Sequence, residues 1–140
     1  MKRYPEMTKQ IASSGHEIAA HGYAHEDFGL LTPDQQIKAI DAADRAIEAV
    51  TGCLPRGFRL PEGGCTKETP QILIDHGYLY DSSFHDHDLP YFFNSNDGNG
   101  SIVEIPFHWE LQDFPYFAFG PHFTPGESRI AIYDDVLENW

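Results

Sequence analysis

The 140-residue sequence has few basic residues, few cysteines and no long apolar run. Nine Lys and Arg stand against 22 Asp and Glu, which gives a formal net charge of −13. A surface of this sign repels phosphate backbones and anionic lipids, so nucleic-acid and membrane partners are not expected. The acidity itself is explained most simply by a solvated, soluble surface.

The two cysteines, Cys53 and Cys65, do not form a Cys-x-x-Cys motif. The sequence therefore indicates neither a zinc knuckle nor a disulfide framework, and two buried or inert thiols are expected. The N-terminal residues are followed by no apolar segment long enough for a signal peptide or a membrane span. We therefore expect a cytoplasmic location.

The sequence alternates between helical and strand-like segments. Its strongest helix signature begins at Thr32, because Thr32, Pro33 and Gln35 fit an N-cap, a first helical position and a capping box. This helix is predicted to end at Gly52. Two further helices are predicted over 5–14 and 69–76, and short strands over 16–20, 57–61, 78–80 and 102–105.

This alternation predicts an α/β fold with parallel strands, in which polar groups gather at the carboxyl ends of the strands. The first three predicted strands lead into His21, Arg59 and Asp81. We therefore expect these three side chains to lie along one edge of the sheet of a single domain.

His21 and His25 are the first candidate metal ligands. Two neutral imidazoles four residues apart, on a helical turn or a tight loop, can face one ion and leave positions for a carboxylate and a water. Eight histidines in 140 residues make such a pair a weak signal by itself. The run from His85 to Asp88 alternates His and Asp and is a second candidate, although such a run is more often a solvated loop.

The segment His21-Gly22-Tyr23-Ala24-His25 resembles the two-histidine metal motif of the polysaccharide deacetylase superfamily, also called carbohydrate esterase family 4. A glycine stands where that motif usually has Ser or Thr. Arg59-Leu60-Pro61 resembles the Arg-x-Pro motif of the same family. The segments 80–83, 86–91 and 109–117 are similar to the branch of allantoinase-like, cyclic-imidase and peptidoglycan-deacetylase-like proteins. The resemblance covers nearly the whole chain and implies a partial distorted (β/α) barrel.

Two motifs of the family have no counterpart in the sequence. The first is a strand ending in an Asp pair that supplies a metal ligand and the general base, and it would lie upstream of Met1. The last is a strand carrying the general-acid His, and it would follow a helix beginning near Asp134. By resemblance, we expect residues 1–140 to be an internal fragment that forms one partial catalytic domain.

The resemblance implies a metal-dependent hydrolase of non-peptide C–N bonds, acting on an N-acetyl sugar or on a cyclic imide or ureide. His21 and His25 would hold a divalent cation, with zinc as the expected metal. Arg59 would orient the catalytic carboxylate; its alternative is a surface Arg paired with an acidic side chain. Asp81 would orient a catalytic His or contact substrate; its alternative is a turn cap made with Ser82 and Ser83.

The second half of the sequence is rich in aromatic residues, which could line a pocket for a ring substrate but are explained more simply by packing. Trp109 and Asp113 are the candidate substrate contacts. A non-catalytic remnant or binding module of the same fold is the main alternative function, and a plain metal-binding protein using His85 and His87 is a third. A partial barrel exposes unpaired strand edges, so we expect a homo-oligomer.

Overall fold

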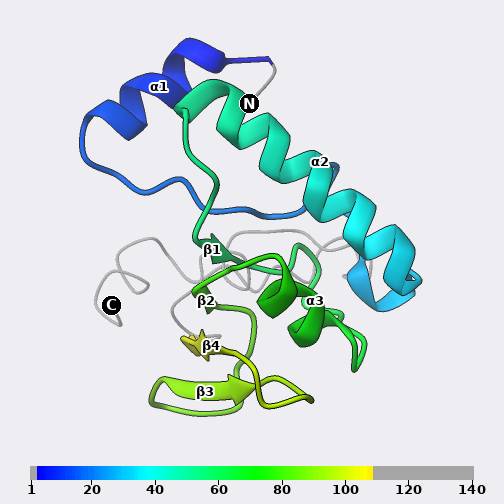
Figure 1. Ribbon diagram of the computed structural model, residues 1–140. Coiled ribbons are helices and arrows are strands. Elements are labelled where there is room, and N and C mark those ends of the chain that lie inside the picture. Colours follow the sequence, from blue (N-terminus) through cyan, green and yellow to red (C-terminus); the bar gives the residue numbers. More distant parts are fainter. Residues whose placement is uncertain (1–2, 109–140) are drawn as a thin grey trace, which may run out of the picture. The chain divides into compact units, whose positions relative to one another are not determined.

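The computed structural model describes residues 3–108, whose helices and strands lie within one compact unit, Met1–Pro106. A four-stranded sheet has the strand order β1-β2-β4-β3 (Figure 1). The elements in chain order are α1 (Pro5–Ser13), the 3-10 turn η1 (Phe28–Leu30), α2 (Pro33–Thr51), β1 (Gly57–Phe58), α3 (Thr69–Asp75), β2 (Tyr80–Asp81), β3 (Tyr91–Asn94) and β4 (Ser101–Glu104).

Helix α2 forms as predicted, and local chemistry fixes both of its ends. The Thr32 hydroxyl accepts a hydrogen bond from Gln35 N, and the Gln35 side chain accepts one from Thr32 N at 2.9 Å. These bonds satisfy two amide groups that the first helical turn leaves without partners. At the other end, Gly52 has a φ of 78°, a left-handed conformation that ends the helix. Helix α1 lies beside the C-terminal half of α2 (Figure 1).

The strands predicted over 57–61 and 78–80 form as the shorter β1 and β2, whereas the one predicted over 102–105 forms as β4 with the same length. The predicted parallel arrangement is confirmed. Strands β1, β2 and β4 pair in parallel, and β3 pairs with β4 in the antiparallel direction. The predicted strand 16–20 is reduced to one bridge between Ala20 and Phe58, because Ala20 alone makes sheet bonds, with Gly57 O and Arg59 N. Strand β3 was not predicted; Pro90 before it and the Gly-containing loop after it obscure the short aromatic run.

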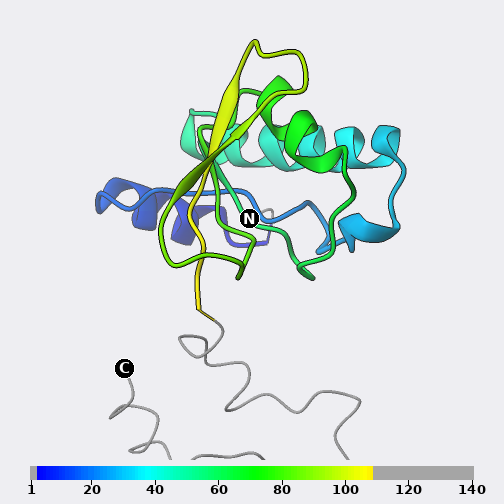
Figure 2. The ribbon, with the colours of Figure 1, turned by 90° about the horizontal axis from the view of Figure 1, so that it is seen from below.

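The core lies between the sheet and helices α2 and α3 (Figure 2). Phe58 of β1 is its centre, with ring centroids 5.4 Å from Phe28 and 5.5 Å from Tyr78. Complete burial of a side chain of this size stabilises the fold by about 1.5–3 kcal/mol. Because Phe58 directly precedes Arg59, the same packing fixes where the Arg59 side chain leaves the sheet.

Among residues 3–108 the sheet is open and not closed into a barrel, as expected for a partial (β/α) barrel. In the same part of the chain, we find no helix that is long and apolar enough to cross a membrane. Cys53 and Cys65 are both free and exposed, so of the two alternatives expected, buried or inert thiols, burial is wrong. Both lie in connections outside the helices and strands.

Candidate functional site

His21 follows the bridge residue Ala20 at the carboxyl edge of the sheet, as predicted. Its Nδ1 atom lies 2.8 Å from the carbonyl oxygen of Arg59. A carbonyl oxygen can only accept a hydrogen bond, so Nδ1 carries the proton. The Nε2 atom is then the ring nitrogen that can bind a cation.

His25 is oriented in the same way by a carboxylate. Its Nδ1 atom lies 3.1 Å from Glu62 Oε1, and each side chain is 56% exposed. The carboxylate favours a proton on Nδ1 and again leaves Nε2 to bind a cation. The two imidazole centroids are 5.1 Å apart, with the His25 ring at 77° to the His21 ring. Glu62 was not predicted, although its place directly after the Arg-Leu-Pro motif is a signal that could have indicated it.

The loop between the two histidines is closely packed. Gly22 has a φ of 66°, and a Cβ atom added there would lie 2.7 Å from Glu26 Oε2 and 3.1 Å from Pro61 Cγ. Glu26 Oε2 also accepts a hydrogen bond of 2.9 Å from Tyr23 N. His25 is the one non-glycine residue with a positive φ, 62°, in the part of the chain that the structure describes. Strained backbone of this kind is concentrated at functional sites.

The two histidines could supply two of the ligands of a metal site. Nε2 of His21 and Nε2 of His25 have the chemistry that zinc and related cations prefer. Residues 3–108 hold no cluster of three or more His, Cys, Asp or Glu side chains that could bind a metal. That finding covers the run from His85 to Asp88 as well. Within that run, Asp86 accepts hydrogen bonds of 2.9 and 3.1 Å from the Tyr91 hydroxyl.

Arg59 reaches from the end of β1 to the turn after β2. Its Nε and Nη2 atoms donate to Ser82 O and Ser82 Oγ, both at 2.6 Å. Ser82 Oγ in turn donates to Ile105 O at 2.7 Å. The Arg59 guanidinium is therefore hydrogen-bonded to the turn that follows β2, while the Arg59 carbonyl oxygen contacts His21 Nδ1. The structure thus brings His21 and Arg59 together as predicted.

Asp81 is 5% exposed and shapes the turn that follows β2. Its Oδ1 atom accepts from Ser82 N at 2.9 Å and from Ser83 Oγ at 2.6 Å. Ser83 Oγ accepts from Leu60 N at 2.9 Å, which links the turn to the residue after Arg59. These bonds are the turn cap expected from the sequence, while a role toward substrate or a catalytic His stays a prediction for Asp81.

Glu104, the last residue of β4, is completely buried and was not predicted as a site residue. Its Oε1 atom accepts from Ser83 N at 3.1 Å and from Phe84 N at 3.0 Å. Burial raises the pKa of Glu104 and, with the nearby Glu104 charge as a further cause, the pKa of Asp81. One acidic residue in the apolar run Ile102–Ile105 is the sequence signal for it.

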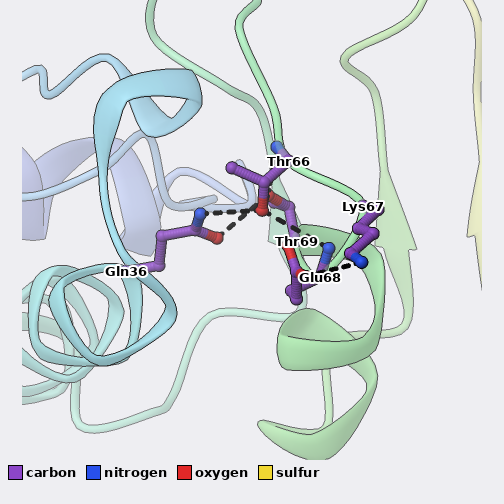
Figure 3. Close-up of polar contacts among 5 residues, drawn as sticks. All are labelled: Gln36, Thr66, Lys67, Glu68 and Thr69. Carbon is purple, nitrogen blue, oxygen red and sulfur yellow. Dashed lines mark hydrogen bonds and ion pairs between the residues drawn. The ribbon is translucent and has the colours of Figure 1, made fainter.

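Gln36 of α2 makes hydrogen bonds with Thr66 and Thr69, at and just before the start of α3 (Figure 3). It is completely buried. Its Nε2 atom donates to Thr66 Oγ1 at 3.1 Å, and its Oε1 atom accepts from Thr69 Oγ1 at 2.9 Å. Nε2 also lies within hydrogen-bond distance of two carbonyl oxygens at η1, those of Phe28 and Leu31. The candidate substrate contacts Trp109 and Asp113 lie outside the described residues.

Comparison with known proteins agrees with this geometry. Residues 1–80 match the family model of polysaccharide deacetylases. The chain is 33% identical to a peptidoglycan deacetylase-like protein of Gibberella zeae over 94% of the chain and 45% of that protein. A solved Mycobacterium smegmatis structure of the polysaccharide deacetylase type is 37% identical, with a TM-score of 0.88 over 99% of the chain and 48% of that protein.

A solved structure of Puue allantoinase is 29% identical, with a TM-score of 0.70 over 80% of this chain and 37% of that one. The chain thus spans about half the length or less of these relatives. The match to the family model covers more than half of the chain and includes both histidines and Arg59. The chain belongs to the polysaccharide deacetylase family, a family of hydrolases.

Proposed function

We propose that the chain carries the histidine part of a metal-dependent site that hydrolyses a non-peptide C–N bond. The observation that supports this most is the orientation of two imidazoles, each tied at Nδ1 so that Nε2 is the metal-binding nitrogen. The leading substrate class is an N-acetyl sugar within a polysaccharide, in line with the names of the relatives. A cyclic imide or ureide is the second class, in line with the allantoinase structure.

A bound divalent cation, expected to be zinc, would polarise the carbonyl group of the substrate and lower the pKa of a bound water molecule. His21 and His25 would hold it through Nε2. The Arg59 carbonyl and the Glu62 carboxylate fix the tautomers of the two rings. The Arg59 guanidinium, held by Ser82, is the group that we expect to orient a carboxylate base by a charge-assisted hydrogen bond.

Three residues complete the proposal. Asp81 would orient a catalytic His or contact the substrate, and Trp109 and Asp113 would contact the substrate.

We also propose a cytoplasmic location and self-association of the 140-residue chain. Sedimentation velocity would measure the self-association directly.

Hydrolysis by the zinc-loaded chain, extended by segments that supply the expected base and acid, tests the proposed reaction. We expect acetate release from N-acetylglucosamine oligosaccharides, or ring opening of a cyclic imide, that is lost in His21→Ala and kept in His85→Ala. Turnover that is equal in His21→Ala and in the unmodified chain would contradict the proposal. Zinc binding at the two histidines without any turnover would favour the non-catalytic binding module.

Glu62→Ala is expected to weaken zinc binding by about 10–100-fold, since loss of the group that orients a ligand commonly has an effect of this size. Glu62→Gln, which keeps an oxygen acceptor for His25 Nδ1, is expected to recover most of that affinity. The free energy of unfolding of the metal-free chain should change little, because the pair is more than half exposed. Calorimetric titration with zinc chloride measures the affinity, and an unchanged affinity in Glu62→Ala would show that Glu62 has no part in the site.

A further inference from the structure

Two buried carboxyl groups face each other across strands β2 and β4. Asp81 and Glu104 are register partners in this parallel pair, so their side chains leave the sheet on the same face. Asp81 is 5% exposed and Glu104 is 0% exposed. Two negative charges side by side in a protein interior are strongly unfavourable unless a donor lies between them.

Among the described residues, the hydrogen bonds around the pair leave a buried oxygen atom of Glu104 without a donor. Two donors reach Asp81 Oδ1, and two backbone amides reach Glu104 Oε1. Glu104 Oε2 is buried and, within residues 3–108, has no hydrogen-bond partner. A buried carboxylate oxygen needs a donor. A protonated Asp81 on the opposite strand provides that donor without any further group.

We propose that Asp81 and Glu104 share one proton as a hydrogen-bonded acid pair, and that this proton maintains the 81–84 turn that positions Arg59. Asp81 is the member that carries the proton, and Glu104 is the member that accepts it. The shared proton itself is independent of the proposed hydrolysis; the consequence of positioning Arg59 for catalysis rests on that proposed function.

The turn connects the acid pair to Arg59 through two serines. Ser83 N donates to Glu104 and Ser83 Oγ donates to Asp81, so both carboxyl groups hold the same residue. Ser82 N also donates to Asp81, and Ser82 supplies both of the acceptors at 2.6 Å for the Arg59 side chain. When the proton leaves, repulsion between the two carboxylates separates β2 from β4 at this turn. Arg59 then loses the geometry of its two acceptors.

The electrostatic surroundings support this arrangement. The pKa of Asp81 is raised to about 7; burial is the largest cause, and the nearby Glu104 carboxyl group is a further one. The hydrogen bond from Asp81 acts in the opposite sense on Glu104 and lowers its pKa, against the larger effect of burial. Other titratable groups that act on the pair, from neighbouring segments, are Cys65, Asp86 and Tyr91. The Arg59 guanidinium lies at Ser82, the residue next to Asp81. Burial raises the pKa of Cys65 and of Tyr91.

The sign of the pH dependence follows from the raised pKa. In the unfolded chain, Asp81 releases its proton at about pH 4, whereas in the folded chain it keeps the proton up to about pH 7. Between these values the folded chain binds one proton more than the unfolded chain, so stability falls as the pH rises. The contribution of Asp81 is fully present below the unfolded pKa and is lost once the pH passes the folded pKa.

NMR titration of the side-chain carboxyl carbons in the 140-residue chain tests the shared proton. We expect the Asp81 signal to titrate with a midpoint near pH 7, and the Glu104 signal to respond to the same event because Glu104 loses its donor. Independent titration of both groups near their ordinary values, about pH 4, would overturn the proposal. This measurement uses the unmodified chain and so does not depend on the folding of any variant.

The Arg59 Nε–H signal tests the link to Arg59. We expect its protection from solvent exchange to be lost above the carboxyl midpoint in the unmodified chain, and kept throughout in Asp81→Asn, whose amide is a permanent neutral donor. Glu104→Gln can donate to Asp81, so the Asp81 midpoint should fall toward its ordinary value. Glu48→Gln on the exposed face of α2 is the control and should leave both titrations unchanged. If Asp81 and Glu104 titrate together but the protection of the Arg59 Nε–H does not change, the proposal that the acid pair positions Arg59 is overturned.

Discussion

The double variant His21→Ala, His25→Ala is expected to bind zinc at least about 100-fold more weakly than the unmodified chain. The loss of both imidazoles removes the two ligand nitrogens, which should cost more than the 10–100-fold typical of residues that only orient a ligand. Both side chains are exposed, and His21 gives up one hydrogen bond to the Arg59 carbonyl. The metal-free variant should therefore lose only about 1 kcal/mol in free energy of unfolding. Equilibrium dialysis followed by elemental analysis measures the bound zinc.

The matched control replaces the other histidine pair, His85 and His87, by Ala. This control should leave zinc binding unchanged. His87 Nδ1 accepts a hydrogen bond from Leu89 N at 3.2 Å, which places the ring proton on Nε2 and leaves neither nitrogen of His87 available to a cation. If zinc binding depends on His85 and His87 and not on His21 and His25, the account of the metal site is wrong.

Gln36→Leu is expected to lower the free energy of unfolding by about 3–5 kcal/mol. Leu is similar in volume but leaves Thr69 Oγ1 without its acceptor and the Phe28 carbonyl without the Gln36 donor. Each buried polar group that loses its partner costs about 1–3 kcal/mol. Urea denaturation followed by circular dichroism measures the change.

Gln10→Leu is the control for this substitution, because Gln10 is exposed on α1. An exposed substitution of this kind should change the free energy of unfolding by no more than about 0.5 kcal/mol. A Gln36→Leu variant as stable as this control would mean that the hydrogen bonds of Gln36 do not stabilise the fold.

The helices could be predicted from the sequence because their ends are fixed by neighbouring residues. Thr32, Pro33 and Gln35 define the start of α2, and Gly52 defines its end, without any contact from distant segments. The strands depend on partners far along the chain. The segment 16–20 looked like a strand but meets its neighbour only at Ala20, and this depends on where β1 lies.

The candidate site could be predicted where it follows from strand order. His21 and Arg59 come together because the carboxyl ends of neighbouring parallel segments meet at one edge. Glu62 and Glu104 act through loop position and strand register. Their local signals, a place directly after Arg-Leu-Pro and a single acidic residue in an apolar run, do not specify the partners that they meet. Glu104 lies opposite Asp81 only because β2 and β4, more than 20 residues apart in sequence, are register partners. Trp109 and Asp113 remain predictions, outside the described residues.

Long-range proton–nitrogen correlation spectra of the histidine rings, recorded with and without zinc, test the central claim most directly. The account predicts that zinc shifts Nε2 of His21 and Nε2 of His25, while Nδ1 of both rings keeps its proton. Zinc-dependent shifts at Nδ1 of these rings, or at His85 and His87 alone, would contradict the proposal that the Arg59 carbonyl and Glu62 orient two imidazoles toward one cation.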